Sequence, residues 1–285
     1  TLSLGNGSGN SDVYKIEEEA GGYVLRYYKE EEISEILWKA EISGVLESEL
    51  KEKLQQVEGD AGIDSEGNII DLGDWEYTII SEDTFSLENV RGTDAYPVYT
   101  GDIEGGEIKL PILIKDNGVI YELTEIGEKA FYGCEDLVSI VVPDTVTSID
   151  YMAFSECTNL LNITMSKSIK SIGNEAFYET AWYESQNDGV IYIGNVLYKY
   201  KGEMPENTMI EIKNNTISIS TNAFNGYQEL VSVTIPENVI EIDFWAFHGC
   251  DNLTSITINK PKDSITGAKW GADNATITWT DGVTE

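Results

Sequence analysis

The stretch EIGEKAFYGCEDLVSIVVPDTVT, residues 125–147, recurs along this chain with a period of 23 residues. SIDYMAFSECTNLLNITMSKSIK (148–170) follows it directly, and later copies are SISTNAFNGYQELVSVTIPENVI (218–240) and EIDFWAFHGCDNLTSITI (241–258). An Ala-Phe pair marks five copies, with spacings of 23, 23, 47 and 23 residues between Phe131, Phe154, Phe177, Phe224 and Phe247. A fixed period of this length predicts an architecture of stacked repeats, so it determines the fold before any local element is considered.

Within one unit the apolar residues keep fixed places, which in the first copy are Ile126, Phe131, Cys134, Leu137, Ile140, Val142 and Val146. A single unit cannot bury these side chains, but stacked units bury one another's. The run from Leu137 to Val142 predicts a strand whose alternation sends Ile140 inward and Ser139 outward. Pro143 then ends the strand because it lacks a backbone donor. The Ala-Phe stretch is too short for a long helix and predicts a single turn on the opposite side.

The combined pattern, I-G-x-x-A-F-x-G-C-x-x-L-x-x-I-x-I-P-x-x-V, closely resembles the BspA-like leucine-rich repeats of bacterial surface proteins. The resemblance covers about residues 123–260 and is shared by five copies. It implies a leucine-rich-repeat solenoid, mostly β with short helical turns. It also implies an extracellular or bacterial cell-surface location and a role in adhesion or ligand recognition. The resemblance brings no catalytic residue to this sequence.

Between the third and fourth Ala-Phe pairs the spacing is one period plus 24 residues, so about 181–207 interrupt the repeat. Two β-rich runs, 190–193 and 196–200, flank Gly194-Asn195, a pair typical of a two-residue hairpin turn. We predict a β-hairpin insert that projects from the solenoid, as insertions do in the BspA-like family. An extra degenerate repeat is the alternative, although the stretch has no Ala-Phe marker.

Strand-rich segments border the repeats on both sides. Residues 61–122 lead without a linker into Ile126, and we predict that they form an N-terminal cap. Residues 261–285 break the period and end in a strand-like run, Ala275–Trp279. We predict that this segment is the C-terminal cap, because a solenoid must cover its last apolar edge.

Residues 12–60 predict a small α+β element of no family that we recognise. Tyr23–Lys29 and Ile33–Ile42 indicate two strands, and four apolar residues then share one helical face: Leu46, Leu50, Leu54 and Val57. Residues 1–11 are rich in Gly, Ser and Asn and predict a flexible leader. The chain opens without Met, so we expect a processed or truncated form, and such a tether often follows a removed export signal.

Composition limits the partners of this chain. Lys and Arg total 18 against 51 Asp and Glu, which gives a formal net charge of −33. Such a surface repels nucleic acid and anionic lipid, while it favours solubility or a partner with a basic surface. No apolar run approaches the roughly 18 residues of a membrane span. We expect a monomer that binds a protein or glycan, with no nucleic acid partner and no transmembrane segment in this chain.

Residues suited to catalysis are scarce. His248 is the single histidine, and other copies carry Tyr132, Ser155, Tyr178 and Asn225 at its place. A serine or cysteine hydrolase needs a histidine base that a third group positions. We therefore interpret His248 as a surface residue and expect no enzyme activity, no catalytic residue and no cofactor.

Metal ligands are also not marked by position. Cys134, Cys157 and Cys250 share one repeat position and predict a buried ladder of free thiols rather than a zinc site, with a Cys134–Cys157 disulfide as the alternative. The acidic stretch 60–71 departs from a calcium loop because Ser65 stands where that loop requires glycine. We predict an acidic turn there and no metal site.

Two sets of residues are candidate ligand contacts. Outward strand positions form one repeated polar face: Ser139, Asn162, Thr164, Glu211, Ser232, Thr234, Ser255 and Thr257. The insert adds aromatic anchors: Trp182, Tyr183, Tyr192, Tyr198 and Tyr200. We predict a non-enzymatic extracellular module that recognises a host or matrix protein through the solenoid and its insert. A carbohydrate-binding module on the cell surface is the alternative, and an accessory part of a larger secreted enzyme assembly is the second alternative.

Overall fold

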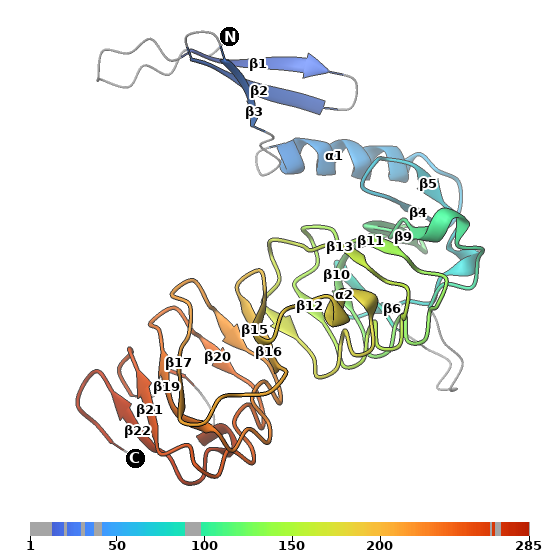
Figure 1. Ribbon diagram of the computed structural model, residues 1–285. Coiled ribbons are helices and arrows are strands. Elements are labelled where there is room, and N and C mark those ends of the chain that lie inside the picture. The colour runs from blue at the N-terminus through green and yellow to red at the C-terminus, as the bar shows by residue number, and fades with distance from the viewer. Residues whose placement is uncertain are drawn as a thin grey trace.

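The computed structural model describes residues 13–19, 22–29, 32–36, 42–88, 98–262, 264–265 and 269–284. Side chains are described from residue 47 onward within these ranges, except at 104 and 269. The predicted leader, 1–11, lies outside the described residues. The fold class is confirmed, because the repeats form a mostly β solenoid whose turns stack from green at β10 to red at β22 in Figure 1.

Short parallel strands form two walls of the solenoid. The first wall contains β10 (Val119–Ile126), β12 (Ser148–Ile149), β14 (Ser171–Ile172), β16 (Val196–Lys201), β18 (Ser218–Ile219) and β20 (Glu241–Ile242). The second contains β8 (Glu107–Ile108), β11 (Ser139–Val141), β13 (Asn162–Thr164), β17 (Thr208–Glu211), β19 (Leu230–Ile235), β21 (Ser255–Ile258) and β22 (Thr276–Trp279). Each Ala-Phe stretch is a turn between the first wall and the second.

Both walls are interrupted at the same level. Along the first wall, β10, β12 and β14 belong to one sheet, and β16, β18 and β20 belong to another. Along the second wall, β8-β11-β13 is separate from β17-β19-β21-β22. In the third repeat a one-turn helix, α2 (Ala181–Glu184), stands where the second-wall strand is expected, and the Trp182 N–H donates to the Leu160 carbonyl at 2.7 Å.

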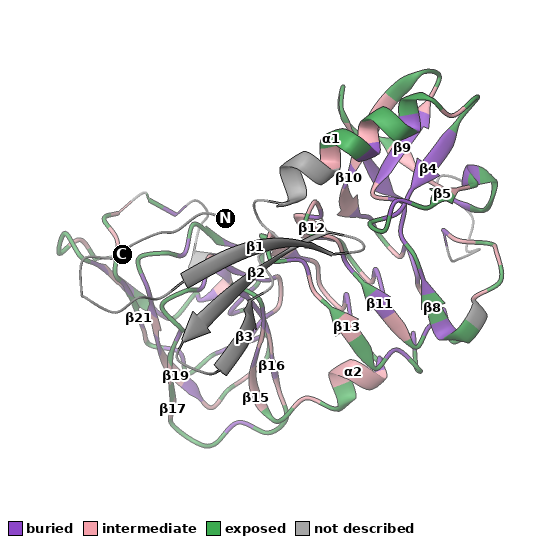
Figure 2. Cartoon of the chain, turned by 90° about the horizontal axis from the view of Figure 1, so that it is seen from above, coloured by how far each residue is buried: buried purple, intermediate pink, exposed green. Residues whose placement is uncertain are grey.

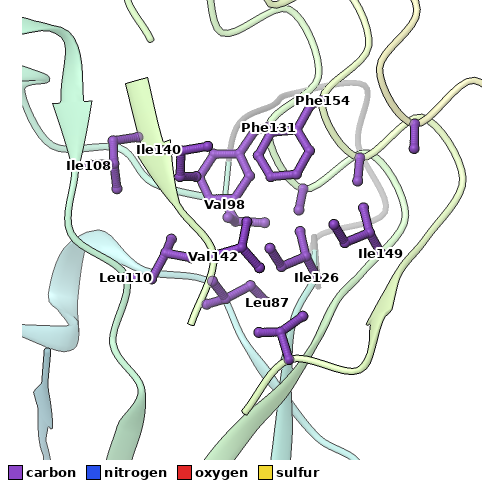
Figure 3. Close-up of a cluster of buried hydrophobic side chains, with 14 of the residues drawn as sticks. Leu87, Val98, Ile108, Leu110, Ile126, Phe131, Ile140, Val142, Ile149 and Phe154 are labelled. Carbon is purple, nitrogen blue, oxygen red and sulfur yellow. The ribbon is translucent and has the colours of Figure 1, made fainter. Parts of the chain in front are cut away.

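The repeat phenylalanines form the centre of the core. The rings of Phe131 and Phe154 lie against each other in Figure 3. Their centroids are 5.2 Å apart with 2° between the planes, and Phe154 stacks on Phe177 at 5.4 Å. Each stacked ring is fully buried. The Phe131 and Phe154 N–H groups also donate to the carbonyls of Ala153 and Ala176 in the following repeat, at 2.7 and 2.8 Å. The Ala-Phe pair thus joins neighbouring repeats by both packing and hydrogen bonding.

Strands on the N-terminal side continue the first repeat. β7 (Thr84–Leu87) pairs with β10 in parallel, and β6 (Thr78–Ile79) pairs with β7. β9 (Leu113–Asp116) joins β10 to β4 (Ala61–Ile63), which pairs with β5 (Ile69–Ile70). Two single turns of 3-10 helix, Leu72–Asp74 and Glu104–Gly106, lie among these strands, and a third covers Lys269–Gly271 near the C-terminus.

The helix α1 (Ile42–Gln55) packs on these strands and not within a separate element that ends at residue 60. Leu50 and Leu54 share a core cluster with Ile63 of β4 and Leu113 of β9. In Figure 2, α1 lies along the buried segments of β4 and β9 and turns exposed residues outward. Burial of these apolar residues therefore joins α1 to the strands on the N-terminal side of the repeats.

Farther upstream, three antiparallel strands form a sheet of their own. They are β1 (Val13–Glu19), β2 (Gly22–Lys29) and β3 (Glu32–Ile36). The sequence missed β1, and β3 ends at Ile36 instead of Ile42.

Replacing Phe154 by Ala removes the middle ring of the first stack. We expect a loss of about 3–5 kcal/mol in the free energy of unfolding, because both transfer energy and cavity terms are lost. Leu161→Ala is the control, since Leu161 is 48% exposed, and it should change stability by less than about 0.5 kcal/mol. Chemical denaturation measures both, and a loss below about 1 kcal/mol for Phe154→Ala would contradict the stack.

Candidate functional site

The hairpin is part of the solenoid wall and does not project from it. β15 (Gly189–Ile193) and β16 pair antiparallel around the predicted Gly194-Asn195 turn. β16 also pairs in parallel with β18, with Val196 opposite Ser218 and Leu197 opposite Ile219. The prediction of a projecting insert is therefore wrong, and the alternative of a degenerate repeat describes β16 better.

Two of the five predicted aromatic anchors are core residues. Tyr198 is 2% exposed and Tyr200 is 7% exposed, so neither can contact a ligand at the surface. The Tyr198 ring meets Phe177 edge-on at 5.8 Å, and its hydroxyl accepts a hydrogen bond from the Phe177 N–H at 3.1 Å. Burial raises the pKa of the Tyr198 hydroxyl well above its usual value. Tyr198 thus supplies the acceptor that an alanine carbonyl supplies for Phe131, Phe154 and Phe224.

The other three aromatic residues of this segment are half-buried. Trp182 packs against Phe177 at 5.2 Å between ring centroids, and Tyr183 packs against the same core. Tyr192 packs on the core of the C-terminal half, with the Lys213 ammonium 4.0 Å above its ring. Burial raises the pKa of both tyrosine hydroxyls. These side chains cover the interruption of the repeat, and only their outer edges are accessible.

The hairpin is the joint between two cores. One core runs from the N-terminal strands to Tyr198, and the other begins with Leu197 and Tyr200 and continues to Trp279. Val196 and Tyr198 of β16 therefore pack in the first core, and Leu197 and Tyr200 pack in the second. Deleting this segment would open both cores, so it cannot be treated as a removable recognition element.

Tyr198→Phe tests this joint. The substitution leaves the buried Phe177 N–H without an acceptor, and we expect the free energy of unfolding to fall by about 1–3 kcal/mol. Tyr192→Phe is the matched control on the same hairpin, because its hydroxyl accepts from the Lys213 N–H at an exposed site where water can replace it. Chemical denaturation should separate the two variants. Equal stability would contradict the role given to the Tyr198 hydroxyl.

The outward strand residues form two aligned rows on one four-stranded sheet. One row contains Met209, Ser232, Ser255 and Thr276, and the other contains Glu211, Thr234, Thr257 and Thr278. The residues between the rows point inward, and Val233, Ile256 and Ile277 are at most 1% exposed. Parallel strands lie about 4.8 Å apart, so the side chains of each row are evenly spaced at that interval. We call this surface the hydroxyl face.

The predicted polar face is divided in two. Ser139, Asn162 and Thr164 lie on the separate sheet β8-β11-β13, where Ser139 pairs with Asn162 and Val141 with Thr164. Sequence reasoning joined the two sheets because it assumed an unbroken strand ladder. It also missed Thr276 and Thr278, although the run Thr276–Trp279 shows the same alternation as the Ser255–Ile258 strand.

The hydroxyl face is nearly neutral on a strongly acidic chain. Glu211 is the one ionisable side chain in the two rows, whereas the chain as a whole has a formal charge of −33. Met209 is 74% exposed at the edge of the face and is its one large apolar residue. Hydroxyls donate and accept hydrogen bonds, so the surface can bind a partner that presents either type of group.

The three cysteines are free, buried thiols, as predicted. Cys157 donates to the Phe131 carbonyl at 2.8 Å, and Cys250 donates to the Phe224 carbonyl at 2.9 Å. Burial raises the pKa of the Cys134 and Cys250 thiols to about 11 and raises that of Cys157 well above its usual value. They are structural residues of the core.

We expect these thiols to be inert in the folded protein. At pH 8 they are protonated and covered, so a thiol reagent such as Ellman's should not react with them within minutes. All three should react in guanidinium chloride, where burial is lost. Rapid release of colour from the folded protein would show that one thiol is accessible and would contradict the packing described.

Two further candidates from the sequence are the acidic stretch 60–71 and His248. The Asp64 carboxylate accepts hydrogen bonds from the N–H groups of Glu66 and Asn68 at 2.9 and 2.8 Å, which makes the acidic stretch a closed turn. His248 is exposed, and its ring lies 5.7 Å from that of Trp245. In the described part of the chain, no group of three or more His, Cys, Asp or Glu side chains is arranged to hold a metal ion.

Repeat strands, turns and phenylalanine stacks together define a leucine-rich-repeat solenoid. The model of the BspA type leucine rich repeat region matches residues 124–201 and 191–269 with six copies, which is just over half of the chain. The chain therefore belongs to the BspA-type leucine-rich-repeat family. The second match begins inside the hairpin, in agreement with the place of β16 as a repeat strand.

Solved structures of bacterial leucine-rich-repeat proteins are similar to this chain. A Treponema pallidum protein, TpLRR, is 22% identical over 72% of this chain and 78% of its own, with a TM-score of 0.36. A protein from Bacteroides capillosus is 20% identical over 67% and 97%, with a TM-score of 0.31. No curated protein matches the chain. None of the helices in the described residues has the length and apolarity needed to cross a bilayer.

Proposed function

We propose that this protein is a non-enzymatic recognition module at the bacterial cell surface that binds a host or matrix protein through its hydroxyl face. Membership of the BspA-type family supports the location, since such proteins are typically bacterial surface proteins. The observation that carries the proposed site is the alignment of the two rows across four strands, β17, β19, β21 and β22.

A flat, aligned face suits a protein partner. Its side chains are short, so little conformational entropy is lost when they are covered. The strands beneath are held by backbone pairing and by a fully buried core, so the face is rigid before the partner arrives. Exposed Met209 at the edge provides an apolar contact beside the hydroxyls.

The net charge of the chain indicates the charge expected on its partner. The face is nearly neutral, but the surrounding chain is strongly acidic, so a partner with basic residues around its contact surface is attracted over long range. This attraction is screened by salt, because the Debye length falls to about 8 Å at physiological ionic strength. Association should therefore slow as salt concentration rises.

Arginine substitutions test the hydroxyl face. An array of immobilised matrix and host-surface proteins identifies a partner, and surface plasmon resonance then compares variants. Thr234→Arg and Thr257→Arg should each weaken binding by at least tenfold, about 1.4 kcal/mol, because a long charged side chain blocks the flat face.

Thr164→Arg is the matched control, since Thr164 is an exposed outward threonine on the separate sheet. It should leave the affinity unchanged. If Thr164→Arg abolishes binding while Thr234→Arg does not, the site is on β8-β11-β13 and the proposal is wrong.

A further inference from the structure

Two adjacent aromatic residues are exposed on the last complete repeat. Phe244 is 83% exposed and Trp245 is 58% exposed, which makes them the most exposed aromatic side chains in the described part of the chain. They lie on the turn between β20 and β21. The other Ala-Phe repeats carry different pairs at this place: Glu128-Lys129, Tyr151-Met152, Asn174-Glu175 and Thr221-Asn222.

The backbone conformation at position 245 does not favour a tryptophan there. Trp245 has a φ of 58°, in the left-handed region, and its counterparts Met152 and Asn222 have φ values of 53° and 57°. Every Ala-Phe repeat needs this conformation, which Asn adopts far more readily than a bulky side chain. Asn222 in the preceding repeat satisfies the requirement. Trp245 meets an unfavourable backbone and gains little burial, so folding alone does not account for it.

Neutral hydrogen-bonding groups lie directly beside the tryptophan. The rings of Trp245 and His248 are 5.7 Å apart and tilted by 49°. His248 Nδ1 lies 3.5 Å from Asn225 Oδ1, and Asn225 Nδ2 donates to Asn222 Oδ1 at 3.0 Å. The stacked repeats hold these three polar side chains in a row, next to an exposed aromatic face.

We propose that Phe244 and Trp245 bind the apolar face of a sugar ring in a neutral oligosaccharide, with Asn225 and His248 binding its hydroxyls. The face of an aromatic ring is electron-rich and attracts the C–H groups on one side of a pyranose. Amide and imidazole groups donate and accept hydrogen bonds, as vicinal hydroxyls require. This glycan site is separate from the hydroxyl face and does not depend on the function proposed for that face.

Size favours a sugar over a protein at this site. A stable protein interface covers about 800 Å² on each partner, whereas two aromatic side chains offer at most about 250 Å² each. Polar groups, His248 and Asn225, adjoin the pair on one side. Charge favours a neutral sugar, because Glu241 and Asp243 precede the pair and the whole chain carries −33. Sulfated and sialylated glycans are repelled.

The full chain can be titrated by isothermal calorimetry with soluble hexasaccharides of four neutral linkage types: cello-, malto-, manno- and laminarihexaose. We expect at least one to bind. The double variant Phe244→Thr with Trp245→Asn copies the Thr221-Asn222 pair of the preceding repeat, so it keeps a sequence that the fold already accommodates. It should melt at the same temperature or higher, and it should bind the sugar at least tenfold more weakly.

Tyr178→Asn is the matched control. Tyr178 is an exposed aromatic residue on another repeat, at 43% exposure, and Asn225 holds the equivalent position. It should bind the sugar with unchanged affinity, and so should Thr234→Arg, which separates this site from the hydroxyl face.

Three results would overturn the proposal. One is the failure of all four hexasaccharides to bind the wild-type chain. Another is equal affinity of the wild type and the double variant. The third comes from sedimentation velocity: if the wild type is a dimer and the double variant is a monomer, Phe244 and Trp245 contact a second copy of the chain.

Discussion

One repeated interaction holds the solenoid together: a phenylalanine ring stacks on the ring of the next repeat while its backbone N–H donates to the alanine carbonyl there. The stacked pairs lie 5.2–5.5 Å apart with planes within 7° of parallel. The alanine beside each ring is fully buried. The spacing of the strands in both walls follows from this contact. Because the core packing repeats evenly, the side chains on the outward faces of the strands are also evenly spaced.

The phenylalanine stack is interrupted once, and the outward faces of the solenoid are divided at the same level. After Phe177 there is no phenylalanine one period later, and the Tyr198 hydroxyl takes the place of the missing carbonyl acceptor. A one-turn helix replaces the second-wall strand in that repeat, and each wall is divided into two sheets at this level. The hydroxyl face and the β8-β11-β13 face are therefore separate surfaces. Trp182, Tyr183 and Tyr198 pack at the C-terminal end of the first core, where the repeat is interrupted.

The repeat leaves few positions free to specialise. Inward positions are fixed by packing, and the left-handed residue before each alanine is constrained by its backbone. Outward side chains of the strands are constrained by neither, and there the chain places hydroxyls on one wall. Trp245 takes the constrained left-handed position of its turn, and Phe244 precedes it. Apart from Glu211, the side chains that make up these two surfaces are uncharged, on a chain of net charge −33. A surface of this charge repels anionic ligands, and both proposed recognition surfaces are the less charged ones.

The sequence alone determined the repeat architecture, the buried phenylalanines and the buried thiols, because each follows from a 23-residue period that is visible without coordinates. It also determined the inward and outward alternation of residues such as Ile256 and Thr257, since a strand has a period of two. Only the tertiary structure decided the role of the hairpin. A hairpin sequence specifies its own turn and pairing, but not whether its outer edge pairs with another strand. β16 does pair with β18, and Tyr198 and Tyr200, which the sequence had offered as candidate ligand contacts, are buried. The period of a sequence identifies its repeated units. The structure at the interruption depends on tertiary contacts, here the pairing of β16 with β18 and the hydrogen bond from the Phe177 N–H to the Tyr198 hydroxyl.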